Sequence, residues 1–320
     1  MFTHSIISNH VTFEAAGLVA LADLSTVAMR TALTGTASYL DTLVLAPGMH
    51  QQQSADEINR GETPEAGAMT TGYTFHIENP ATVRYLQTIG RTGHLVTASV
   101  SQTPSHLSKH NRQIQSFIVA GIPATLLYLL CPVLTISILA ILGAMGDWWG
   151  FGVLWMLVLA RLINVVVIKR RSHRGWKGAY EIGKGDLLIL VSQDRWVRLQ
   201  GSVTDLKTVT AGQWLREMSA IESFSAAFAT LLVYLSAAVA GNASEVGSLL
   251  IAGLLLCSVA LLGLCNSLTK CLQMYNCVVR VEGEPKRYQQ RSVMAIELVG
   301  EACRDDWAIQ MGLIVRNDAS

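Results

Sequence analysis

Long apolar runs without charged residues dominate the pattern along this chain. Asp, Glu, Lys and Arg are missing from residues 113–146, 223–244 and 246–269, and Arg161 is the one charge within residues 148–168. A helix rises about 1.5 Å per residue, so about 20 apolar residues cross the hydrocarbon layer of a bilayer. The pattern predicts a membrane all-α bundle of four transmembrane helices, at about 117–144, 148–168, 222–241 and 246–268.

The segments outside these runs carry polar and strand-like patterns. β-Rich runs occur at 72–77, 94–100 and 276–285, and residues 185–201 predict a hairpin around a Ser-Gln-Asp turn. We therefore expect a cytosolic mixed α/β portion beside the bundle. The predicted parts are an N-terminal region 1–115, a first transmembrane hairpin 116–168, a middle segment 169–219, a second transmembrane hairpin 220–269 and a tail 270–320.

The N-terminal region begins with an apolar stretch of a different kind. Its charges recur at Glu14, Asp23, Arg30 and Asp41. Charges at this spacing argue against a fifth span, because each would be costly in the hydrocarbon layer. The pattern favours amphipathic helices that pack on the α/β portion or on the membrane surface.

The distribution of Lys and Arg predicts how the spans are oriented. The middle segment has ten of these residues, the tail seven and the N-terminal region six, whereas the connections at 145–147 and 241–246 have none. Cytosolic loops carry an excess of Lys and Arg. We expect a multi-pass protein with both termini in the cytosol; the charges do not distinguish an endomembrane from the plasma membrane.

Composition agrees with a membrane location and narrows the function classes. The chain is 51% hydrophobic and 15% charged, with a mean hydropathy of +0.37, whereas soluble domains carry about 25% charged residues. A net charge of +1 argues against a nucleic-acid partner. The six cysteines form no CxxC pair, and the chain has no P-loop, GxSxG or GxGxxG motif. The sequence therefore predicts no cofactor and no metal site, and it favours a non-catalytic role.

Arg161 is the most unusual residue within a predicted span. A central arginine costs about 2.5–3.5 kcal/mol on insertion scales. Three interpretations remain open: the side chain snorkels to the interface, it pairs with Glu222 while Asn164 shares the contact, or it binds a substrate. The sequence thus predicts an intramembrane polar cluster of Arg161, Asn164 and Glu222.

Basic residues follow this span directly. They are a topology signal and also suit anionic lipid headgroups. This headgroup set consists of Lys169, Arg170, Arg171, Arg174 and Lys177.

Two modification sites and one packing surface are further candidates. Asn242 begins an Asn-Ala-Ser sequon for N-glycosylation, and Cys265 and Cys271 flank the end of the fourth span, where S-acylation occurs. The third span is rich in Ser and Ala, which allow close helix packing. That surface predicts a contact within the chain, a homo-oligomer or a membrane partner.

Residues 195–215 ("RWVRLQGSVTDLKTVTAGQWL") and 250–268 ("LIAGLLLCSVALLGLCNSL") resemble a group of multi-pass membrane proteins of filamentous fungi. That group has no assigned activity, so the resemblance implies a fungal membrane protein and no catalytic residue. The leading hypothesis is an anchoring or interaction role through the cytosolic portion. The alternatives are a membrane-embedded enzyme or accessory factor acting on a lipophilic small molecule, with Arg161, Asn164 and Glu222 lining its site, and a transporter or channel subunit.

Overall fold

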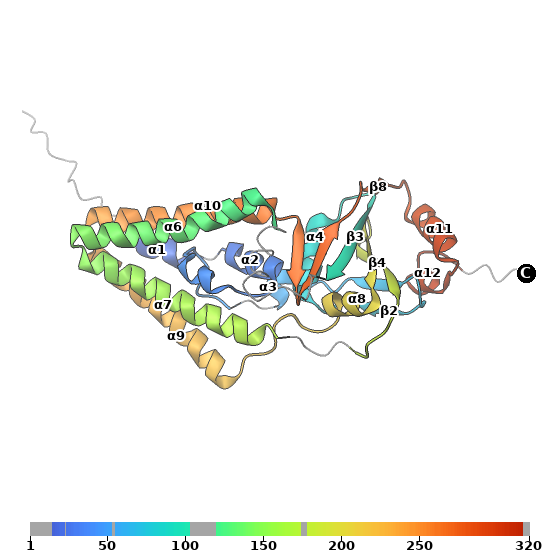
Figure 1. The fold of residues 1–320 in the computed structure, drawn as a ribbon, viewed down its shortest axis with the longest axis horizontal. Helices are drawn as coiled ribbons and strands as arrows, with labels where there is room; N and C mark the ends of the chain where they lie inside the picture. Colours follow the sequence, from blue (N-terminus) through green and yellow to red (C-terminus); the bar gives the residue numbers. More distant parts are fainter. Residues whose placement is uncertain (1–14, 23, 53–54, 103–119, 174–177, 316–320) are drawn as a thin grey trace, which may run out of the picture.

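A helical bundle and a sheet portion lie end to end in the molecule (Figure 1). The computed structural model describes residues 15–22, 24–52, 55–102, 120–173 and 178–315. Four of its helices are long and apolar enough to cross a membrane. They are α6 (Ile122–Met145), α7 (Trp148–Arg171), α9 (Ala220–Val239) and α10 (Glu245–Leu268). The predicted helices are therefore confirmed, while their pairing into membrane hairpins stays a prediction.

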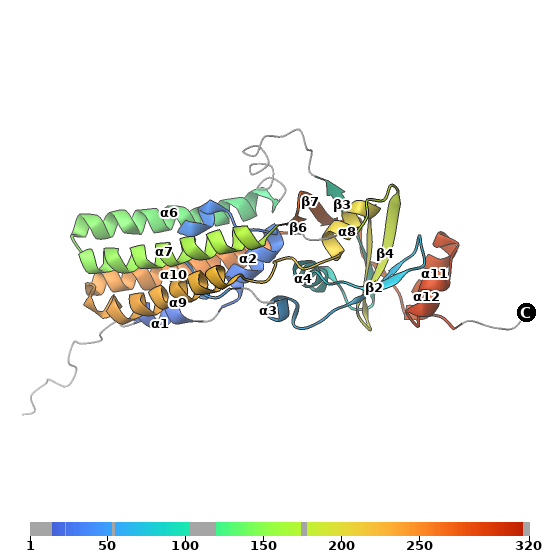
Figure 2. The same cartoon turned by 90° about the horizontal axis from the view of Figure 1, so that it is seen from below.

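The main helix contacts of the bundle join helices that are not consecutive in the chain. Helix α7 lies along α9, and α6 lies along α10. The short connections after α6 and α9 both lie at the end away from the sheet portion (Figure 2). The Asp147 carboxylate ties them together, since it accepts hydrogen bonds from Ser244 Oγ at 2.6 Å and from Gly150 N at 3.0 Å. Burial raises the pKa of Asp147, but these hydrogen bonds outweigh it and hold that pKa below its ordinary value.

The prediction that the N-terminal apolar stretch packs on the α/β portion is confirmed for its second helix, whereas the rest of the stretch packs on the long helices. The stretch forms α1 (Ala15–Leu21), α2 (Thr26–Thr34) and the short 3-10 helix η1 (Tyr39–Leu43). Helix α1 packs on α9 and α10, and a Cβ added to Gly17 would lie 2.8 Å from the Ala237 carbonyl oxygen. Helix α2 reaches strand β6 (Cys271–Met274) at the other end of the bundle.

Residues 36–52 then turn back among the long helices, where η1 packs on α6 and α7. Val44, Leu45, Ala46 and Met49 are at most 2% exposed. We call residues 15–52 the inserted segment: a broken helix along the bundle, followed by a loop that enters and leaves from the sheet end.

Eight strands drawn from all three polar parts of the chain form one sheet, which confirms the predicted mixed α/β portion. Their order is β2-β1-β4-β5-β3-β7-β6, with β8 also on β3, and only β3 and β5 among these pairs run parallel. The predicted hairpin is the β4–β5 pair. The other strands are β1 (Glu65–Ala68), β2 (Thr74–His76), β3 (His94–Gln102), β4 (Lys184–Ser192), β5 (Arg195–Ser202), β7 (Cys277–Val281) and β8 (Lys286–Arg287).

Helices cover both faces of this sheet (Figure 1). Helices α3 (Ala55–Asn59), α4 (Pro80–Ile89) and α8 (Val203–Thr210) lie toward the bundle, and α11 (Arg291–Ala302) and α12 (Asp306–Gln310) lie on the far face. Side chains alternate between the faces along a strand. Accordingly, Trp196 of β5 packs with Trp307 on the far side, while Val197 packs with Leu206 toward the bundle.

Buried hydrogen bonds lock the bundle to the sheet portion. Trp214 Nε1 donates to the Gly35 carbonyl at 2.7 Å, and Tyr275 Oη donates to the Trp214 carbonyl at 2.8 Å. Gly35 ends α2 with φ of +70°, and a Cβ there would lie 2.4 Å from the Gln273 carbonyl oxygen. Tyr85 Oη donates to the Lys270 carbonyl at 3.0 Å. Hydrogen bonds and a close backbone contact thus join the two portions at several points.

Trp214→Phe tests this junction. The indole is 1% exposed, and its loss removes one buried hydrogen bond and leaves a small cavity, so we expect about 1–3 kcal/mol of destabilisation. The thermal midpoint of the purified chain in detergent measures the effect. Trp149→Phe is the matched control, because Trp149 is 58% exposed on α7; an equal shift in both variants would contradict the proposed role of the junction.

Candidate functional site

Arg161 binds the inserted segment rather than Glu222. Its side chain is buried, and Nε donates to the Asp41 carbonyl oxygen at 3.1 Å. Tyr128 Oη donates to the Asp41 carboxylate at 2.6 Å, and the Arg30 guanidinium carbon lies 4.9 Å from the centre of the Tyr128 ring. One carboxylate thus lies among two arginines and a tyrosine in the interior of the bundle.

Other polar side chains of the long helices hold the same segment. Each donates to a backbone carbonyl of the inserted segment, and the first three of these carbonyls lie at the end of η1 or in the loop after it. The bonds are Asn164 Nδ2 to Met49 at 2.8 Å, Thr135 Oγ1 to Leu43 at 2.7 Å, Thr230 Oγ1 to His50 at 3.1 Å and Asn266 Nδ2 to Thr26 at 2.9 Å. Irregular backbone at membrane depth requires such partners. The polar groups of the helices therefore have an architectural role.

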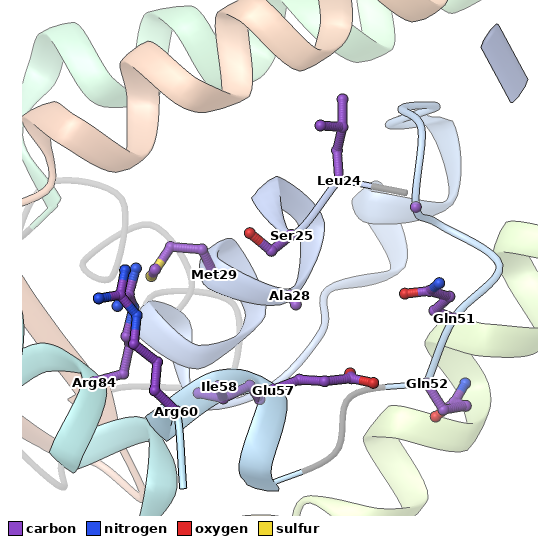
Figure 3. Close-up of a pocket in the computed structure, with 11 residues that line it drawn as sticks. Leu24, Ser25, Ala28, Met29, Gln51, Gln52, Glu57, Ile58, Arg60 and Arg84 are labelled. Carbon is purple, nitrogen blue, oxygen red and sulfur yellow. The ribbon is translucent and has the colours of Figure 1, made fainter. Parts of the chain in front are cut away.

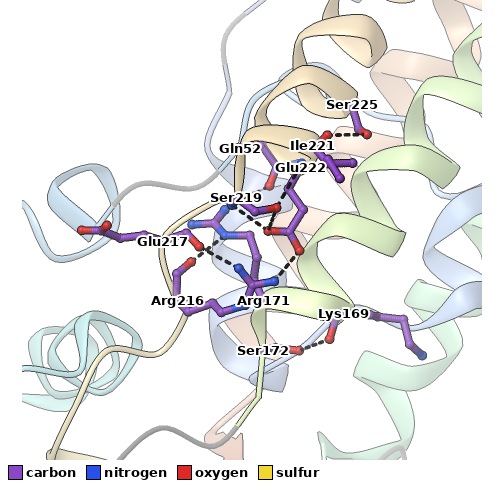
Figure 4. A network of polar contacts seen from close by, with 10 residues as sticks. All are labelled: Gln52, Lys169, Arg171, Ser172, Arg216, Glu217, Ser219, Ile221, Glu222 and Ser225. Atoms are coloured by element: carbon purple, nitrogen blue, oxygen red, sulfur yellow. Dashed lines mark hydrogen bonds and ion pairs between the residues drawn. The ribbon is translucent and has the colours of Figure 1, made fainter.

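Glu222 begins α9 and belongs to a separate network (Figure 4). Its carboxylate forms an ion pair with Arg216 and accepts from Ser219 N at 2.9 Å, which completes a capping box. The predicted contact between Glu222 and Arg161 is wrong, because the Glu222 carboxylate binds Ser219 and Arg216 instead. Arg171 donates from Nε to the Arg216 carbonyl at 2.9 Å and from Nη1 to Gln52 at 3.2 Å.

The predicted headgroup set is only partly available for lipids. Arg171 is 7% exposed because of the contacts just described, so its assignment to headgroups is wrong. The Lys169 ammonium lies 3.9 Å from the centre of the Tyr39 ring. Arg170 is exposed, and Arg174 and Lys177 lie outside the described residues.

The two predicted cysteine sites are poorly placed for S-acylation. Cys265 is 0% and Cys271 1% exposed, so neither thiol can reach an acyl donor in this fold, whereas Cys257 and Cys303 are exposed. Burial also raises the pKa of the Cys271 thiol, which lowers its nucleophilicity. Asn242 is exposed, but Ser244 of its sequon caps α10 and binds Asp147; glycosylation stays a prediction.

A pocket of about 270 Å³ lies where the inserted segment meets α3 and α4 (Figure 3). Two guanidinium groups, those of Arg60 and Arg84, lie together at one end, and the Glu57 carboxylate lies on the side of Gln52. The lining residues are Leu24, Ser25, Ala28, Met29, Gly48, Gln51, Gln52, Glu57, Ile58, Arg60 and Arg84. The pocket therefore combines an apolar wall with a cationic end.

Local structure explains the direction of Arg60. Its φ of +60° is left-handed, which costs an ordinary residue about 1–2 kcal/mol. The buried Asn59 fixes this turn, since Nδ2 donates to the Glu62 carbonyl and Oδ1 accepts from Gly61 N, both at 3.0 Å. Burial, and then the charge of Arg60, hold the pKa of Arg84 below its ordinary value. Strained backbone beside two like charges is typical of a functional site.

A scan against protein-family models, a search of curated proteins and a search of solved structures each found no match. The resemblance to fungal membrane proteins therefore stays a prediction. Within the described part of the chain, no group of three or more His, Cys, Asp or Glu side chains could hold a metal ion.

Arg161→Leu tests the architectural role of the buried cluster. Breaking a buried charge contact by removing one partner costs about 3–5 kcal/mol, so we expect the folded fraction after detergent extraction to fall sharply. Asp41→Asn in the same chain should not restore it, because Arg161 donates to the backbone carbonyl of Asp41, while Arg30 and Tyr128 still accompany the carboxylate.

Arg170→Leu is the control on the same helix, because Arg170 is exposed; it should keep the folded fraction unchanged. Glu222→Gln should not rescue Arg161→Leu. Rescue by Glu222→Gln would overturn the assignment of the Asp41 carbonyl as the partner of Arg161.

Proposed function

We propose that this chain is a multi-pass membrane protein with an anchoring or interaction role, which its rigid mixed α/β portion performs in the cytosol. The observation that carries the proposal is the locked junction between the portions through Gly35, Trp214 and Tyr275. Such a junction holds the sheet portion in a fixed orientation to the bilayer. An anchor needs this property, whereas a flexible tether would suffice for simple attachment.

The distribution of charges supports the cytosolic side for the sheet portion. Lys169, Arg170 and Arg171 end α7 at the sheet end of the bundle, and the connections at the other end have no Lys or Arg. The positive-inside rule favours the cytosol for the basic end. The prediction that both termini are cytosolic remains a proposal, since residues 1–14 and 316–320 lie outside the described residues.

The enzyme alternative gains no support from its proposed residues. Arg161 and Asn164 hydrogen-bond to the inserted segment, and Glu222 pairs with Arg216. The broken helix α1–α2 does favour a transporter, because discontinuous helices form many transport sites. However, the Thr26 carbonyl beside its interruption accepts a hydrogen bond from Asn266, so this group is not available to a passing ion. The architectural role accounts better for the same residues.

Cysteine accessibility tests the membrane orientation. Cys303 is exposed on the sheet portion and Cys257 on α10, where we expect lipid. In sealed vesicles with the cytosolic face outward, an impermeant maleimide should label Cys303 and not Cys257. Gly241→Cys, in the exposed far connection, should react only after the vesicles are opened. Labelling of Gly241→Cys in sealed vesicles and of Cys303 only after opening would reverse the orientation.

Substitutions on the exposed face of α11 test whether the sheet portion binds partners. Val293 and Ile296 are 51% and 64% exposed, and this helix lies at the tip farthest from the bundle (Figure 1). If partners dock there, the double variant Val293→Glu and Ile296→Glu should lose most neighbours found by cross-linking in intact membranes. Thr71→Glu with Ser101→Glu adds the same charge at exposed positions outside α11 and serves as control. Equal cross-linking by both variants would exclude this face.

A further inference from the structure

We propose that the pocket between the inserted segment and α4 binds the phosphate headgroup of an anionic lipid, with the Arg60–Arg84 pair as the phosphate site. Within the described residues, neither guanidinium forms an ion pair with a carboxylate. Two arginines that repel one another without an opposing charge form a site that an anion would stabilise. Arginine binds phosphate oxygens in bidentate geometry, so a pair can hold one phosphate by several donors.

The nearest acidic residues have other contacts. Glu62 accepts from Gln87 Nε2 at 2.6 Å, and the same amide nitrogen donates to the Asn59 carbonyl at 2.9 Å. Glu57 lies on the other side of the pocket from the two guanidinium groups (Figure 3). Among the described side chains, no carboxylate therefore opposes the arginine pair, which leaves it to an external anion.

The position of the pocket beside α7 favours a lipid over a soluble phosphate. Gln52 lines the pocket and bonds to both Asn164, at 2.6 Å, and Arg171, at 3.2 Å. These two residues of α7 lie seven positions apart, or about 10 Å along the helix. Gln52 thus places one side of the pocket beside the basic end of a candidate span, the level at which a headgroup meets its acyl chains.

The apolar part of the pocket lining suits hydrocarbon. Leu24, Ala28, Met29 and Ile58 supply it, and Leu24 is 42% exposed. A ligand with a phosphate at Arg60 and Arg84 and a chain along Ala28 would satisfy both ends of the pocket. Inorganic phosphate would satisfy only one.

Binding to the full chain in a neutral detergent tests this site by native mass spectrometry. The probes are dihexanoyl phosphatidic acid, dihexanoyl glycerol and inorganic phosphate. We expect the phosphatidic acid to bind at least about tenfold more tightly than either other probe, because only it engages both ends. Arg60→Gln with Arg84→Gln should weaken its binding at least about tenfold.

Two controls separate the site from general effects. Arg91→Gln removes an exposed charge outside the pocket and should bind as the wild type does. Ala28→Leu should fill the apolar wall and weaken the lipid but not inorganic phosphate. A thermal shift adds a second readout: phosphatidic acid should raise the melting midpoint of the wild type and leave that of the double arginine variant unchanged.

Each outcome decides the proposal. Binding of the double arginine variant at the strength of Arg91→Gln would overturn the site. Equal affinity for inorganic phosphate and phosphatidic acid would overturn the lipid assignment, since the phosphate source would then be soluble. Equal affinity for dihexanoyl glycerol would show that the arginines contribute nothing.

Discussion

Buried backbone without regular hydrogen bonds is the constraint on which the rest of this structure depends. The inserted segment breaks between α1 and α2 and then forms a loop among the four long helices, where water cannot satisfy its carbonyls. Asn164, Thr135 and Arg161 donate to that backbone from two different helices. Each unsatisfied group would cost several kcal/mol in an apolar medium. The polar residues of the spans are therefore explained by the segment that they hold.

This constraint also shapes the junction with the sheet portion. Because residues 36–52 enter and leave the bundle at the same end, both ends of the loop lie close to the sheet. Gly35 contacts Trp214 there, and Gln52 contacts Arg171. The sheet end of the bundle and of the inserted segment packs into the core of the sheet, where Val165 and Ile168 of α7 belong with strand residues such as Val197, whereas the rest of the bundle has its own core.

The sequence predicted those features that depend on local pattern. Charge-free runs located the four long helices, and alternation located β3, the β4–β5 hairpin and β7. It failed where partners are far apart in the chain: Arg161 and Asp41 are separated by 120 positions. Arg30 and Asp41 argued against burial when each was considered alone, yet together with Tyr128 they lie in one buried group. One signal in the sequence could have indicated this buried group. The long helices contain more polar side chains than one ion pair between Arg161 and Glu222 would use.

The pocket could not be predicted for a related reason. Arg60 and Arg84 lie in no motif, and ordinary surface arginines look the same in sequence. What distinguishes them is geometry: a left-handed turn fixed by Asn59 and the position of α4 bring two positive charges together beside an apolar wall. Like charges at close range destabilise the unliganded chain, and natural proteins retain such arrangements where function requires them. The buried cluster at Arg161 does not consist of like charges alone, because the Asp41 carboxylate lies among its arginines. The inserted segment also accepts the hydrogen bond that Arg161 donates. Arg30 and Arg161 therefore stabilise the bundle, whereas Arg60 and Arg84 are the arginines that we propose bind a ligand.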